Sequence, residues 1–68
     1  MTPEDAIVLC DEILELIEEL PDDAEDFGMQ VGERVDDIKE WIEDNERCTD
    51  PQATALENMK AGVERWIN

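Results

Sequence analysis

The chain has 68 residues, of which 21 are Asp or Glu and 5 are Lys or Arg, so its formal net charge is −16. A chain this short forms a single domain with a thin core, because folding buries only about 60% of its unfolded surface. The negative charge repels nucleic acid and anionic membranes, which excludes both as expected direct partners, and it attracts basic protein surfaces.

The N-terminus has no basic region, and no apolar run approaches the ~18 residues of a membrane span. We therefore expect a cytoplasmic protein. The two cysteines, Cys10 and Cys48, could form one disulfide, but two reduced thiols are the preferred interpretation for a cytoplasmic chain.

The first predicted helix covers residues 3–20, with Thr2 as N-cap and Pro3 at the first helical position. Pro21 disfavours helical geometry at Leu20 and ends the segment. Apolar residues fill one half of the helical wheel, and acids fill the other half except for Val8. The apolar half consists of Ala6, Ile7, Leu9, Cys10, Ile13, Leu14, Leu16, Ile17 and Leu20.

The second predicted helix covers residues 23–46, with Asp22 or Asp23 expected as its cap. Gly28 and Gly32 each weaken it by about 1 kcal/mol relative to Ala, and we expect one helix that is weak in its first third rather than a break. Its apolar stripe is Ala24, Phe27, Val31, Val35, Ile38 and Ile42, with Trp41 on the flank.

The third predicted helix covers residues 50–67 and begins with a capping box, in which Thr49 is followed three residues later by Gln52. Its expected buried residues are Ala53, Leu56, Met59, Val63, Trp66 and Ile67. Three amphipathic helices with short connections predict one all-α domain over residues 1–68, a small antiparallel three-helix bundle.

The residue types needed for common enzyme chemistry are missing. The sequence has no His, Ser or Tyr, which removes Ser–His and Cys–His catalysis and any histidine metal ligand. A calcium loop starting at Asp22 would have Asp26 and Glu33 at positions 5 and 12, but Ala24 at position 3 and Gly28 one place late. We expect no enzyme activity, cofactor or metal site.

The charge is distributed unevenly: residues 1–20 carry net −7, residues 21–47 net −8 and residues 48–68 net −1. Acids three or four apart on a helix lie about 5–6 Å from each other, comparable to phosphates along a DNA strand. This spacing predicts a nucleic-acid mimic that inhibits a basic DNA- or RNA-binding protein. The expected contact acids are Glu15, Glu18, Asp26, Glu33, Asp37, Glu40 and Asp44.

Three other interpretations stay open. The acids could form ordinary solvated faces, or reflect a host with a salty cytoplasm, although the near-neutral third helix counts against the second. The protein could instead be an adaptor or antitoxin-like module that binds a basic partner without resembling DNA. A homodimer that shares the apolar arc of the first helix is also open.

Val8 and Met29 interrupt the acidic arcs, and we expect them to be exposed. If they contribute to function, they are apolar anchors within an electrostatic contact; single exposed apolar residues are otherwise ordinary. Arg34 and Lys39 flank the stripe of the second helix and are expected to pair with acids of neighbouring helices.

The stretch TDPQATALENMKAGVERW, residues 49–66, resembles the terminal helix of small phage- or mobile-element-encoded proteins of unknown role. The resemblance covers about a quarter of the chain. It implies a mobile-element setting, in which small acidic inhibitors of host nucleic-acid machinery are common, and it assigns no functional residue.

Overall fold

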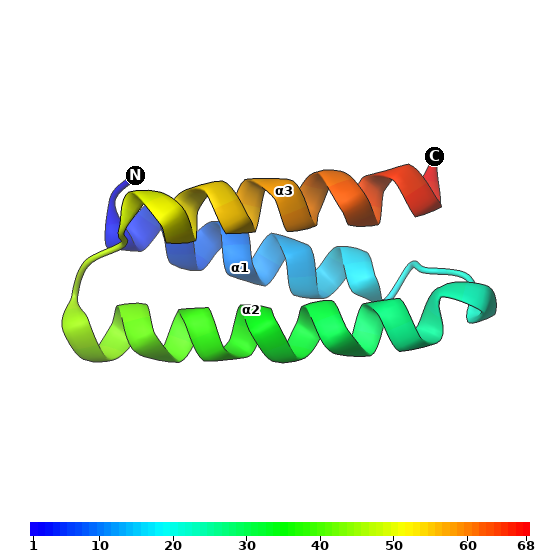
Figure 1. Cartoon of the computed structure of the whole chain (residues 1–68), viewed down its shortest axis with the longest axis horizontal. Coiled ribbons are helices and arrows are strands. Elements are labelled where there is room, and N and C mark those ends of the chain that lie inside the picture. Colours follow the sequence, from blue (N-terminus) through cyan, green and yellow to red (C-terminus); the bar gives the residue numbers. More distant parts are fainter.

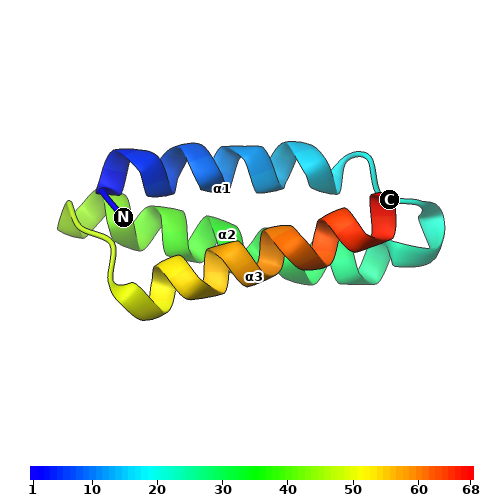
Figure 2. The same cartoon turned by 90° about the horizontal axis from the view of Figure 1, so that it is seen from above.

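The computed structural model describes all 68 residues and is an all-α bundle of three helices, as predicted (Figure 1). Helix α1 spans Pro3–Ile17, α2 spans Glu25–Asn45 and α3 spans Asp50–Ile67, with a short 3₁₀ helix, η1, at Asp22–Ala24. Successive helices run antiparallel, so α1 and α3 point the same way (Figures 1 and 2). None of the three is both long and apolar enough to cross a membrane.

The N-terminal caps of α1 and α3 are those that the sequence predicts. The hydroxyl of Thr2 accepts a hydrogen bond from the backbone N–H of Asp5 at 3.1 Å. Thr49 and Gln52 form a reciprocal capping box, in which each side chain accepts from the other residue's backbone N–H, at 3.3 and 3.0 Å. Each cap satisfies backbone donors that the first helical turn leaves unpaired.

The predicted end of the first helix, residue 20, was wrong by three residues. The α-helix ends at Ile17, and the backbone N–H groups of Glu18, Glu19 and Leu20 bond to carbonyls three residues earlier. Pro21 keeps Leu20 out of helical geometry, and the chain tightens into 3₁₀-type turns before it reverses.

The predicted start and cap of the second helix were also wrong. Asp22 and Asp23 lie inside η1, which follows Pro21, and α2 begins at Glu25 after Ala24; neither helix has a side-chain cap. From there α2 runs without interruption through both glycines to Asn45, as preferred above. Glu46 then adopts a left-handed φ of 53°, which ends the helix.

The core is thin, with ten buried residues in the whole chain. The predicted apolar stripes of the three helices supply nine of them: Ala6, Cys10, Ile13, Ala24, Val31, Val35, Ile42, Leu56 and Val63. The tenth is Gly28 of α2. The predicted burial of Trp66 was wrong, because 49% of this residue is exposed. It packs on Phe27, with ring centroids 6.3 Å apart, and most of α3 packs on α1 rather than on α2.

Two lysines tie α1 to its neighbours. Lys39 of α2 bonds to Asp11 at 2.8 Å, and Lys60 of α3 bonds to Glu12 at 3.1 Å; these hydrogen bonds raise the pKa of each lysine above its ordinary value. They are the only ion pairs, so the pairing expected for Lys39 is confirmed and that expected for Arg34 was wrong. Arg34 is exposed without a carboxylate partner.

Candidate functional site

The predicted acids of α2 form one continuous exposed row. Asp26, Glu33, Asp37, Glu40 and Asp44 recur every three, four or seven residues, which places them on the side of α2 opposite its buried stripe. From Asp26 to Asp44 the row covers 19 residues, an axial rise of about 27 Å. None of the five makes an ion pair or a side-chain hydrogen bond, so all five carboxylates are available to a partner.

Glu15 and Glu18 are likewise exposed on α1, together with Val8, which is 57% exposed. Glu15 lines a hollow with Lys60 and Glu64 of α3, so the α1 acids do not continue the α2 row. We use the name acidic face for the two exposed helix sides together, that of α1 with Glu15 and Glu18 and that of α2 with its row. Of the 21 acids in the chain, only Asp11 and Glu12 are in ion pairs. The negative charge of the acidic face is therefore nearly uncompensated within the molecule.

The two apolar anchor candidates do not form one patch. Val8 lies three residues before Asp11, whereas Met29, which is 61% exposed, lies ten residues before Lys39. Because α1 and α2 are antiparallel, Val8 and Met29 lie on opposite sides of the Asp11–Lys39 pair along the bundle axis. The two apolar residues are therefore about 20 Å apart along that axis. A partner would have to span most of the molecule to bury both.

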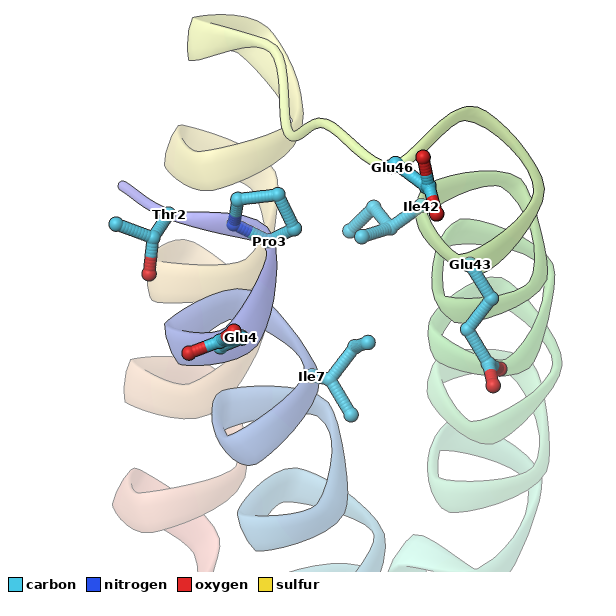
Figure 3. Close-up of a pocket in the computed structure, with 7 residues that line it drawn as sticks. All are labelled: Thr2, Pro3, Glu4, Ile7, Ile42, Glu43 and Glu46. Carbon is cyan, nitrogen blue, oxygen red and sulfur yellow. The ribbon is translucent and has the colours of Figure 1, made fainter.

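The antiparallel packing of α1 and α2 also creates an acidic hollow that sequence reasoning missed. Figure 3 shows Ile7 and Ile42 pointing into the gap between the two helices, with Glu43 and Glu46 on α2; Glu4, which also lines the hollow, lies on α1 with its side chain turned away from α2. The hollow has a volume of about 560 Å³. The available signal in the sequence was weak: Glu4 and Glu43 border the apolar stripes of their helices, but only the fold brings them together.

Neither thiol is arranged as a nucleophile, and no metal-binding cluster is present. Cys10 is fully buried, and burial, followed by the nearby Asp11 charge, raises its pKa to about 11. Cys48 is partly buried, and its thiol donates to the carbonyl of Thr49 at 3.6 Å. No group of three or more Cys, Asp or Glu side chains could hold a metal ion.

Comparisons with protein-family models, curated proteins and solved structures find no match for this chain. No functional residue can therefore be transferred from a relative.

Proposed function

We propose that this protein is a non-enzymatic acidic inhibitor that occupies the nucleic-acid site of a basic DNA- or RNA-binding protein. The observation that carries the proposal is its linear charge density. A net charge of −16 along a longest dimension of 35 Å averages one negative charge per about 2.2 Å, against about 1.7 Å for duplex DNA. A groove shaped to neutralise phosphates would meet a comparable density of carboxylates.

The rigidity of the acidic face supports the proposal. Its carboxylates stand on two packed helices rather than on loops, so a partner would order side chains but not backbone. The α2 row is about 27 Å long, a length over which one DNA strand places roughly eight phosphates. The five carboxylates of the row present repeated charge along one axis as a nucleic-acid backbone does.

The acidic hollow supplies a second kind of contact. A lysine or arginine of the partner could lay its aliphatic stem on Ile7 and reach Glu4, Glu43 or Glu46 with its charged head. Such an inserted side chain would give the complex a fixed register, which charge attraction alone does not provide. A cytoplasmic location and a mobile-element origin are part of the same proposal.

The test is affinity capture from a host lysate with three immobilised proteins: wild type, Glu33→Gln/Glu40→Gln in the α2 row, and Glu57→Gln/Glu64→Gln on α3. The two variants have the same net charge, and each changes two glutamates seven residues apart. We expect the wild-type protein to capture nucleic-acid-binding proteins, and excess duplex DNA to displace them. Of the two variants, only the α2 variant should capture less of these proteins than wild type.

Other outcomes refute specific parts of the proposal. A partner that stays bound despite excess DNA would show an ordinary protein interface and favour the adaptor or antitoxin-like alternative. Equal losses in both variants would show that capture depends on total charge and not on the acidic face.

A further inference from the structure

Two of the three arginines and two of the three aromatic residues of the chain line adjoining hollows between α2 and α3: Arg34, Arg65, Phe27 and Trp66. Phe27, Arg34 and Trp41 are spaced by seven residues, which puts them on one stripe of α2. Arg47 follows α2 and stacks its guanidinium over the Trp41 ring, 5.6 Å from the centroid. From α3, Arg65 and Trp66 reach the opposite end of the same side.

Between these helices lies an open groove without any acidic lining residue, which we call the arginine–aromatic groove. Its principal residues are Phe27, Val31, Arg34, Met59, Arg65 and Trp66. The larger part of the groove has a volume of about 340 Å³, and Gln30, Asn58 and Gly62 complete its lining. Three other hollows on the surface, the acidic hollow among them, are each lined by two or more acids. In a chain with 21 acids, the groove is thus a chemically distinct surface.

The basic groups of the groove are not used inside the protein. Both ion pairs use lysines, and no carboxylate lies within ion-pair distance of Arg34, Arg47 or Arg65. Arg65 donates only through Nε, at 3.5 Å to the carbonyl of Ala61, and its terminal amino groups make no protein hydrogen bond. The half-exposed Trp66 has an apolar neighbour in Phe27 and an open outer surface.

We propose that the arginine–aromatic groove docks an acidic amphipathic helix of a partner protein. Apolar side chains of that helix would cover Phe27, Met59 and Trp66, and flanking carboxylates would bind the planar guanidinium groups of Arg34 and Arg65 in two-point contacts. Tryptophan and arginine are the residue types that most often dominate binding energy at such surfaces. The proposal is independent of the partner of the acidic face.

Charge selects this occupant over two others. A nucleic-acid strand could stack on tryptophan, but its continuous phosphate charge would be repelled by the net charge of −16. A second copy of this chain would bring another −16 within a few ångströms, where screening over about 8 Å is incomplete. A partner helix of 16 residues is about 24 Å long, which matches the roughly 27 Å of the 18-residue α3. Such a helix needs only a few carboxylates to bind the arginines, so it brings less negative charge than a nucleic-acid strand or a second copy of this chain.

The experiment is selection from a displayed library of 16-residue helices whose positions vary among Leu, Phe, Ala, Glu, Lys and Gln, with wild-type protein as target. Recovered peptides are titrated against Trp41→Phe protein, in which Trp66 is the only fluorescent tryptophan. The test variant is Arg34→Gln/Arg65→Gln, and the control is Arg47→Gln/Thr54→Glu. Both variants have a net charge of −18, and the two control positions are exposed and do not line the groove.

We expect recovered peptides with apolar residues at i, i+3 or i+4, and i+7, flanked by glutamates. Their affinity should fall by about tenfold or more in Arg34→Gln/Arg65→Gln and stay unchanged in the control. Arg34→Glu/Arg65→Glu should bind the same peptides only after their glutamates are changed to lysines. The proposal is overturned if the selection recovers basic peptides or no peptides, or if peptide affinity is the same in wild type and in Arg34→Gln/Arg65→Gln. It is also overturned if sedimentation equilibrium finds a dimer of wild type that Arg34→Gln/Arg65→Gln dissociates.

Discussion

Gly28 and Gly32 offer a matched pair of substitutions that tests how α2 packs on α1. The two glycines are one turn apart within the same continuous helix, and both have ordinary helical backbone geometry. A Cβ added at Gly32 would lie 3.8 Å from Cδ1 of Ile17, an ordinary contact. A Cβ added at Gly28 would lie 3.0 Å from Cδ1 of Leu20 and 3.2 Å from Cγ2 of Ile17.

The two changes should therefore differ in their effect on the free energy of unfolding. Each gains up to about 1 kcal/mol from the better helix propensity of Ala and the smaller entropy of its unfolded chain. Gly32→Ala keeps that gain. Gly28→Ala loses it to overpacking of about 1–3 kcal/mol, because the Leu20 methyl can rotate away but Cγ2 of Ile17 is fixed to the Cβ of a packed helix.

Urea titration and thermal unfolding, both followed by circular dichroism, measure the difference. For a domain of this size, each kcal/mol corresponds to roughly 4–8 °C in Tm. We expect Gly32→Ala to melt higher than wild type, and Gly28→Ala to melt at the wild-type temperature or below it. Equal stabilisation by both substitutions would refute the close approach of α1 and α2 at Gly28. Destabilisation by both would refute an unbroken α2.

Four further predictions concern the core, a cap and the two thiols. Leu56→Ala removes a fully buried side chain and should lower the free energy of unfolding by about 2–5 kcal/mol in urea titration; a loss below 1 kcal/mol would contradict its burial. Thr49→Ala removes half of the capping box and should cost about 1 kcal/mol, whereas the exposed Thr54→Ala inside the same helix should raise the Tm slightly through the better helix propensity of Ala. At pH 8, iodoacetamide should modify Cys48 well before Cys10, and equal rates by mass spectrometry would show that α1 opens readily. Because the pKa of Cys10 rises from 9.0 to about 11 on folding, its contribution to stability is complete below pH 9 and is lost as pH rises toward 11. Wild type should therefore lose more stability over that range than Cys10→Ala.

Exposure of the predicted acids needed only the sequence, because it depends on local periodicity. All seven acids expected at the contact are exposed, as are Val8 and Met29. Their grouping was beyond sequence reasoning. The register of α1 against α2 separates the two apolar residues by about 20 Å, and the same register gathers Glu4, Glu43 and Glu46 into the acidic hollow.

The sequence by itself determined the three helices, two of their caps and the apolar stripes, because a period of 3.6 residues and a capping hydroxyl act within one or two turns. It did not determine which helices pack against each apolar stripe, since periodicity defines the buried side of a helix but not which other helix covers that side. Only the tertiary structure decided that α1 packs against both other helices while the seam between α2 and α3 stays partly open. That arrangement leaves Trp66 half exposed and places two unpaired arginines, Arg34 and Arg65, along one groove.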